Sequence, residues 1–224
     1  MAAAARRANR PASDIALVAV SKFQSVAAIE EAYRAGQRLF GENRVQEAEE
    51  KKRALAHLVD GPDPLRLELI GVLQSNKVRK AIASVSRIQS IDTVDIGVRV
   101  GRVAAGMGRT IPILIQVNLA GEATKAGVSE SDLFPALESL KTVAGITVLG
   151  LMAIPPFLDN ADEVRPYFAN LRSLRDEAAS RGLLAGRELS MGMSHDFEAA
   201  IEEGATLVRV GTAIFGERVL PPLL

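Results

Sequence analysis

The chain has 224 residues, of which 48% are apolar and 24% charged, and this composition is typical of a globular protein with a substantial core. Basic and acidic residues both number 27, so the charge favours neither nucleic acid nor an anionic membrane as a partner. The absence of cysteine excludes disulfides and thiolate chemistry, and two histidines argue against a histidine-rich metal site.

No apolar run approaches the length of about 18 residues that a transmembrane helix needs. Residues 1–14 lack the apolar segment of a signal peptide, and we expect them to form a short helix or a frayed end. A transit peptide is the alternative. We expect a cytoplasmic protein.

Apolar, β-branched runs alternate with stretches of helical periodicity along the whole chain. In chain order, the expected strands cover residues 15–20, 38–41, 65–71, 87–91, 110–118, 146–152, 187–192 and 206–211. The expected helices cover residues 25–35, 43–58, 75–85, 94–106, 129–141, 161–181 and 196–204, and residues 215–218 begin a final helical turn. Ser25 is a predicted helix cap, and Pro135 is expected in the first turns of its helix.

This alternation predicts an α/β fold. Strict strand–helix alternation implies a parallel sheet, and eight units in a chain of this size indicate a single (β/α)8 barrel of the TIM type. We expect residues 1–224 to form one domain. A doubly wound open sheet is the alternative fold, but its GxGxxG phosphate fingerprint is absent after the first strand.

Polar and small side chains follow the expected strands, where the active sites of such barrels lie. The stretch "IALVAVSK" ends in Lys22, an amine at the end of a buried strand, where burial lowers the pKa of a lysine. Lys22 could equally extend from the strand end into water, and Asn43 after the second strand could equally cap a helix. Other strand ends are followed by Glu42, Gln74, Lys77, Asp92 and Asn118.

The last two loops favour a phosphate site. The segments "GMSHD" (192–196) and "GTAIFG" (211–216) combine glycines with two expected helix starts. They also carry the hydroxyls of Ser194 and Thr212, and loops of this kind bind phosphate in many barrels. Ser194 or Asp196 could cap the helix that follows, and His195 is expected to be exposed in the turn.

Arg209 lies in the last expected strand, on the same face as Leu207 and Gly211. An arginine inside a barrel needs a partner, which could be an anion, an aromatic nitrogen heterocycle or a nearby carboxylate. A lysine that faces a phosphate site indicates a Schiff base with a phosphorylated aldehyde or ketone. Pyridoxal 5′-phosphate (PLP) and a sugar phosphate both fit.

Motifs over nearly the whole chain resemble those of the pyridoxal phosphate homeostasis proteins, which are similar to the N-terminal barrel of alanine racemases. The matching motifs are "LVAVSK" (17–22), "FGENRVQE" (40–47), "LIGVLQSNK" (69–77), "ILIQVN" with "GEATKAGV" (113–128), "GLMAIPP" (150–156) and "LSMGMSHDFEAAIEEGATLVRVGTAIFGER" (189–218). The last motif is long and specific.

The resemblance implies that PLP forms a Schiff base with Lys22 and that Asn43 lies near the cofactor ring. It implies phosphate contacts from Ser194, Arg209, Gly211 and Thr212, with Met191 and Gly192 in the same loop. Arg209 would also approach the pyridine nitrogen, and the ring would then stay neutral and be a weaker electron sink. No metal and no catalytic residue is implied.

The family is associated with PLP homeostasis rather than with efficient turnover. We therefore expect a PLP-binding protein that transfers the cofactor to PLP-dependent apoenzymes, and we expect a monomer. This chain departs from the family pattern in three places: Leu67 and Glu68 replace Trp-His, Gln24 stands where a second lysine is frequent, and His195 replaces a small or polar residue.

Two enzyme functions are alternatives. A weak amino-acid racemase would need a second acid/base group opposite Lys22, and both tyrosines, Tyr33 and Tyr167, lie in expected helices. An aldolase would need acid/base groups such as Glu42, Asp92 and Lys77 around the lysine. The extended motif match argues against the aldolase.

Overall fold

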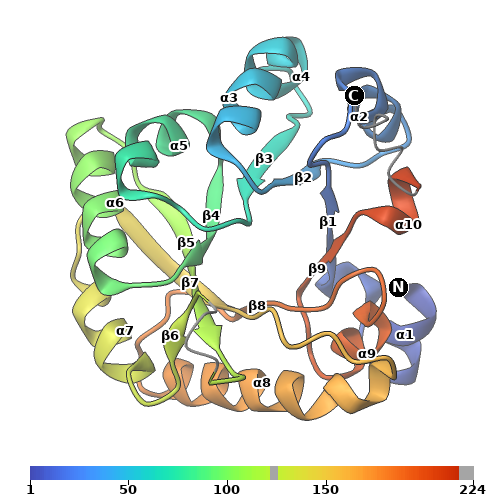
Figure 1. The fold of residues 1–224 in the computed structure, drawn as a ribbon, viewed down its shortest axis with the longest axis vertical. Helices are drawn as coiled ribbons and strands as arrows, with labels where there is room; N and C mark the ends of the chain where they lie inside the picture. The colour runs from blue at the N-terminus through green and yellow to red at the C-terminus, as the bar shows by residue number, and fades with distance from the viewer. Residues whose placement is uncertain (122–125, 217–224) are drawn as a thin grey trace, which may run out of the picture.

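The computed structural model describes residues 1–121 and 126–216, in which parallel strands form a closed ring surrounded by helices (Figure 1). Neighbouring strands follow the order β4-β3-β2-β1-β9-β8-β7-β5, and pairing of β4 with β5 closes the ring. The strands of the ring are β1 (Ala16–Val20), β2 (Leu39–Glu42), β3 (Arg66–Leu69), β4 (Arg87–Ile91), β5 (Ile111–Asn118), β7 (Ile146–Met152), β8 (Glu188–Ser190) and β9 (Leu207–Val210). The prediction of a (β/α)8 barrel is confirmed.

The helices that connect the strands differ from the expected ones mainly where a helix begins. They are α2 (Val26–Arg34), α3 (Val45–Ala54), α4 (Ala56–Val59), α5 (Val78–Ser84), α6 (Val94–Gly106), α7 (Leu133–Lys141), α8 (Arg165–Ser180), α9 (Phe197–Glu202) and α10 (Thr212–Phe215), with 3-10 turns η1 (Ala12–Asp14), η2 (Ser75–Lys77) and η3 (Ala161–Val164). The helix expected over residues 43–58 is divided at Leu55, where the chain turns and buries the leucine side chain completely. Ser25 caps α2, as predicted, by accepting a hydrogen bond from the Ala28 amide.

The helix expected over residues 129–141 begins later than predicted. A short additional strand, β6 (Val128–Ser129), pairs with the end of β5, and Ser129 Oγ then accepts a hydrogen bond from the Asp132 amide. Because of this turn, α7 begins only at Leu133. Pro135 lies in the first turn of α7, where the amide has no partner within the helix and its missing hydrogen costs nothing. The final helical turn expected to begin at residues 215–218 is partly outside the described residues. In the part that is described, α10 begins earlier, at Thr212, and ends at Phe215.

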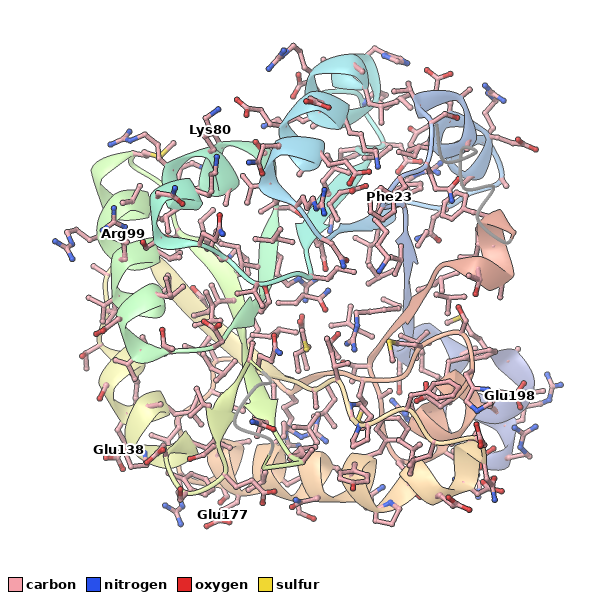
Figure 2. All side chains as sticks on the ribbon, in the orientation of Figure 1. Phe23, Lys80, Arg99, Glu138, Glu177 and Glu198 are labelled. Atoms are coloured by element: carbon pink, nitrogen blue, oxygen red, sulfur yellow. The ribbon has the colours of Figure 1, made fainter. Side chains whose placement is uncertain are left out.

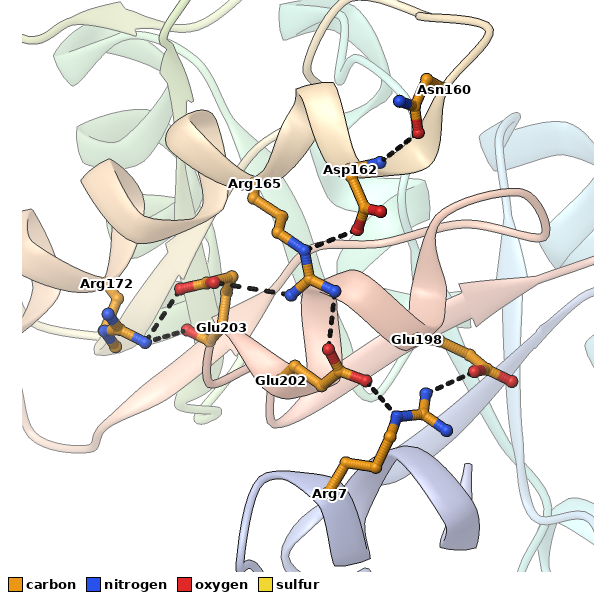
Figure 3. Close-up of polar contacts among 8 residues, drawn as sticks. All are labelled: Arg7, Asn160, Asp162, Arg165, Arg172, Glu198, Glu202 and Glu203. Carbon is orange, nitrogen blue, oxygen red and sulfur yellow. Dashed lines mark hydrogen bonds and ion pairs between the residues drawn. The ribbon is translucent and has the colours of Figure 1, made fainter.

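The N-terminal segment forms a helix that packs on the barrel, so the alternative of a frayed end is wrong. Helix α1 (Ala2–Arg7) buries Ala4 and Ala5, and Arg7 forms ion pairs with Glu198 and Glu202 of α9 at 2.5 and 2.6 Å (Figure 3). Glu202 also pairs with Arg165 of α8 at 2.6 Å. These ion pairs connect the N-terminal helix α1 to α9, and α9 to α8. No helix within the described residues could span a membrane.

The barrel interior holds a small apolar cluster next to buried polar groups. Met152, Ser190 and Leu207 are register partners across β7, β8 and β9, so their side chains share one face. Met152 and Leu207 pack with Val18 and Leu114 in a cluster separate from the main core, which lies between the strands and the helices. Buried polar side chains therefore occupy the same interior as this apolar cluster.

Candidate functional site

A cavity of about 230 Å³ lies at the carboxyl ends of the barrel strands, and this volume suits a small-molecule ligand. It is lined by Val20, Lys22, Gln24, Asn43, Ile70, Ile154, Met193, Ser194, Arg209, Gly211, Thr212 and Gly216. Six of the eight predicted site residues are in this set: Lys22, Asn43, Ser194, Arg209, Gly211 and Thr212. The strand ends therefore bring together residues up to 190 positions apart, from Lys22 to Thr212.

The loop that carries Lys22 is a tight turn held from both sides. Ser21 donates its amide to the Gly41 carbonyl on β2 and accepts the Gln24 amide at 2.9 Å. Phe23 takes a left-handed conformation with φ of 64°, which is uncommon for a residue with a side chain, and its amide donates to Glu47 at 2.5 Å. Figure 2 shows the Phe23 side chain on the barrel side of the ring of helices, whereas Lys80, Arg99, Glu138 and Glu177 lie on the outside. The backbone of Lys22 is therefore fixed by both of its neighbours.

A buried ionic group lies directly beneath this turn, and we call Ser21, Glu42, Glu47 and Lys51 the Glu42 cluster. Glu42 Oε1 accepts hydrogen bonds from Ser21 Oγ at 2.6 Å and from Lys51 Nζ at 2.8 Å. Lys51 Nζ also donates to the Ser21 carbonyl and to Glu47 Oε1. The Glu42 side chain is completely buried, and Oε2 has no hydrogen-bond partner among the described residues.

Burial dominates the titration of Glu42 and raises the pKa of its carboxyl above the usual range. The charge of Lys51 and the hydrogen bonds from Lys51 and Ser21 act in the opposite direction and lower that pKa. An aldolase would need Glu42 as an acid/base group facing the cavity. In the structure the carboxylate is occupied by Ser21 and Lys51 and is absent from the cavity lining.

The loops after β8 and β9 meet at the cavity. Ser194 Oγ accepts a hydrogen bond from the Gly211 amide at 3.3 Å, so the two loops are directly linked next to Thr212. Asp196 is the N-cap residue of α9, one of the two predicted, but its side chain forms no capping hydrogen bond: Asp196 Oδ1 instead accepts the Met193 amide at 2.6 Å. The result is a concave surface of hydroxyls, glycine backbone and amide groups, of the kind that binds phosphate.

Met191 and Gly192 are not part of the cavity lining. Met191 is completely buried in the main core, and Met193 lines the cavity in its place. Gly192 has φ of 88° and lies against α9. Its carbonyl accepts a hydrogen bond from the Arg209 amide of β9 at 3.0 Å. This left-handed glycine changes the direction of the chain after β8, so strand alternation could not predict which methionine faces the cavity.

Arg209 is almost completely buried and reaches the cavity from β9. Its Nη1 donates to Ser190 Oγ at 2.6 Å, and its Nη2 donates to the Ala153 carbonyl at 2.9 Å. No carboxylate within the described part of the chain forms an ion pair with it, so that alternative is not supported. Burial lowers the pKa of the Arg209 guanidinium to about 10, and Arg209 therefore remains a cation at neutral pH.

The other polar residues predicted at strand ends occupy two neighbouring cavities. Gln74 and Lys77 line one that also contacts Asn43 and Arg44, and Asp92 and Asn118 line another. His195 is exposed, as predicted; its ring lies 5.2 Å from that of Phe157, and Nε2 lies 3.1 Å from the Asp159 carbonyl. Within the described residues, no group of acidic or histidine side chains could hold a metal ion.

Comparison with known proteins agrees with this geometry. The family model of the alanine racemase N-terminal domain matches residues 1–219. The pyridoxal phosphate homeostasis protein of Aquifex aeolicus is 44% identical over 215 residues, which cover 96% of this chain and 92% of the relative. This chain belongs to the pyridoxal phosphate homeostasis protein family. The member from Escherichia coli is 38% identical over 223 residues, covering 97% of this chain and 92% of the relative.

Solved structures show that this chain shares its fold with PipY and with the alanine racemases. PipY of Synechococcus elongatus, solved with PLP bound, is 42% identical with a TM-score of 0.83, and the match covers 96% of this chain and 98% of PipY. An alanine racemase of Clostridium difficile has a TM-score of 0.69 at 14% identity, over 97% of this chain and 55% of the racemase. The racemase comparison therefore supports a shared fold and nothing more.

Several cavity residues of this family member were not predicted from its sequence. Val20, Ile70 and Ile154 provide apolar walls, and Gly216 is also part of the lining. The three apolar residues end or follow a strand, but in the sequence an apolar residue at a strand end cannot be distinguished from a residue of the core. Gln24 was noted only as a departure from the family pattern, and the structure places it in the cavity lining.

Proposed function

We propose that this protein binds PLP in the cavity at the carboxyl ends of the strands and takes part in intracellular PLP homeostasis. The observation that carries the proposal is the convergence of Lys22, Arg209 and the linked loops of Ser194 and Gly211 on one small cavity. The PLP-bound structure of PipY supports it, because PipY is 42% identical over nearly the whole chain.

The residues of the cavity fit the functional groups of PLP. The hydroxyls of Ser194 and Thr212 provide phosphate contacts. The amide of Gly211 donates to Ser194 Oγ and supports the phosphate site through that hydroxyl. Lys22 provides the amine for the aldehyde: Nζ adds to the aldehyde carbon, a carbon–nitrogen double bond forms, and water leaves. When bound, PLP supplies an electrophilic aldehyde and an electron-accepting ring.

Arg209 suits the ring nitrogen of this cofactor. Its guanidinium is buried at the cavity, and two of its N–H groups are already used by Ser190 and Ala153. The remaining N–H groups can donate to a neutral pyridine nitrogen, and the guanidinium keeps its protons at neutral pH, so the pyridine nitrogen stays unprotonated. Asn43 lines the same cavity and would contact the ring.

A carrier fits these residues better than a racemase does. A two-base racemase needs an acid/base group on the face of the ring opposite Lys22. Tyr33 donates its hydroxyl to the Asp63 carbonyl at 2.7 Å, and neither Tyr33 nor Tyr167 lines the cavity.

We propose that the protein is cytoplasmic and monomeric, forms one domain, and transfers PLP to apoenzymes. A transfer rate to an apoenzyme equal to that from free PLP would refute the carrier role.

The absorption spectrum of the purified protein with PLP tests the proposal. We expect a yellow band that borohydride abolishes and a reduced adduct that peptide mass mapping assigns to Lys22. Lys22→Ala should lose both, whereas the control Lys77→Ala, in the neighbouring cavity, should keep both. A colourless protein, or an adduct that persists in Lys22→Ala, would refute the proposal.

A further inference from the structure

A line of hydrogen bonds crosses the barrel interior from Arg209 to β3, and we call Arg209, Ser190, Gln89 and Glu68 the interior relay. Arg209 Nη1 donates to Ser190 Oγ at 2.6 Å, and Ser190 Oγ donates to Gln89 Oε1 at 2.5 Å. Gln89 Nε2 donates to Glu68 Oε2 at 2.5 Å. All four side chains are buried, so water does not compete for these bonds.

The far end of the interior relay is an ionic group at the sheet. Glu68 Oε1 accepts a hydrogen bond from Arg87 Nε at 3.0 Å, and Arg87 also binds Glu188. Burial raises the pKa of the Glu68 carboxyl, while Arg87 and Gln89 donate to its two oxygens and thereby favour the ionised form. The negative charge of Glu68 is thus matched by a cation on β4 and connected to a second cation on β9.

The direction of every bond in the interior relay follows from the carboxylate. An ionised carboxylate only accepts hydrogen bonds, so Gln89 must turn its amide nitrogen toward Glu68 and its oxygen toward Ser190. The Ser190 hydroxyl must then donate to Gln89, which leaves its lone pairs for Arg209. A side chain that can also donate would not impose this order.

We propose that Glu68, Gln89 and Ser190 are positioning residues that orient the Arg209 guanidinium toward the ring of the bound cofactor. This inference rests on the proposed function, because the ring is that of PLP in the same cavity. Glu68 keeps Ser190 an acceptor, Ser190 and the Ala153 carbonyl hold two N–H groups of Arg209, and the remaining N–H groups point to the ligand in one defined plane. Glu68 therefore affects PLP without contacting it.

Two variants and a matched control test the interior relay in the full-length protein. Glu68→Gln removes the charge but keeps the shape, and Gln89 is then free to turn over. We expect PLP affinity to fall by about five- to tenfold, as for the loss of one ordinary hydrogen bond, and the absorption maximum of the bound cofactor to shift. Glu177→Gln removes an exposed carboxylate that pairs with Arg181 on α8, away from the relay, and should change affinity less than about twofold.

Ser190→Ala breaks the interior relay next to Arg209 and makes the test specific. If Glu68 acts through Ser190, Glu68→Gln has no further effect on affinity or spectrum in the Ser190→Ala background. Effects of the two substitutions that add fully, or a Glu68→Gln variant with the wild-type affinity and spectrum, would overturn the inference. If Glu68→Gln does not fold, Ser190→Ala alone must reproduce the loss of affinity and the spectral shift, and wild-type values would refute the relay.

The same experiment separates this inference from the function on which it rests. Absence of a borohydride-reducible adduct on Lys22 in the wild-type protein refutes PLP binding itself. A normal adduct in the wild type, together with unchanged affinity and spectrum in both variants, refutes only the interior relay. A general loss of packing is distinguished in two ways. Glu177→Gln controls for the loss of a carboxylate elsewhere on the protein. A purely structural role of Glu68 would change the thermal unfolding midpoint without a spectral shift.

Discussion

The ammonium group of Lys51 lies 2.6 Å from the carbonyl oxygen of Ser21, the residue directly before Lys22. The same nitrogen binds Glu42 and Glu47, and Glu47 in turn accepts the amide of Phe23. One buried lysine on α3 therefore holds the backbone on both sides of the lysine that faces the cavity. This relationship connects the stability of the barrel to the geometry of the candidate site.

Lys51→Met should destabilise the protein strongly. It leaves Glu42 completely buried without its cation, and breaking a buried ion pair in this way costs about 3–5 kcal/mol. The free energy of unfolding from urea titration measures the loss. Lys52→Met, at the next and more exposed position of α3, should cost much less, and equal losses for the two variants would contradict the prediction.

Glu42 should make the protein less stable as the pH rises. Its carboxyl has a higher pKa in the folded state than in the unfolded chain, so its contribution is fully present below pH about 4.3 and is lost as the pH rises through the folded value. Each unit of that difference corresponds to about 1.4 kcal/mol.

The variant Glu42→Gln isolates this effect. The unfolding free energy of the wild type minus that of Glu42→Gln should fall between pH 4 and 7. Glu50→Gln, at an exposed position of the same helix, serves as the control and should show a flatter difference. A difference that rises with pH would show that Lys51 and Ser21, rather than burial, dominate the titration of Glu42.

Gly192→Ala should disrupt the loop after β8. The residue has φ of 88°, and a Cβ atom there would lie 2.4 Å from the Cβ of Ala200 on α9. Backbone strain and overpacking together should cost about 3 kcal/mol or more. Gly36→Ala is the control, because Gly36 has a similar φ of 102° but open space around it, and should cost only the strain. Equal melting temperatures of the two variants would refute the packing argument.

Ser194→Ala should weaken the binding of PLP by about tenfold or more, as expected when a hydrogen bond to a charged phosphate is lost. Pyridoxal lacks the phosphate, so its affinity should change little. Titrations of both ligands, monitored by absorbance, measure the ratio. Ser173→Ala, on the exposed face of α8, is the control. An equal loss for both ligands would indicate that Ser194 supports the loop rather than the phosphate.

Much of the fold could be predicted from local patterns. The bounds of β4 and β7 and of α6 agree with the expected segments because each segment is bounded by clear changes of periodicity. The helix over residues 43–58 was not predicted correctly at Leu55, because helical periodicity continues through the turn at which this leucine is buried. Local sequence carries no information about that packing.

For the candidate site, the sequence by itself determined the alternation of strands and helices, and hence that Lys22, Ser194 and Arg209 follow or end strands at one edge of a barrel. Only the tertiary structure decided that Met193 rather than Met191 lines the cavity, since a left-handed Gly192 interrupts the alternation between them. Only the closed ring brings Glu68 on β3 into line with Arg209 on β9. Hydrogen bonds across a barrel depend on strand register and closure, and neither leaves a periodic signal in the sequence.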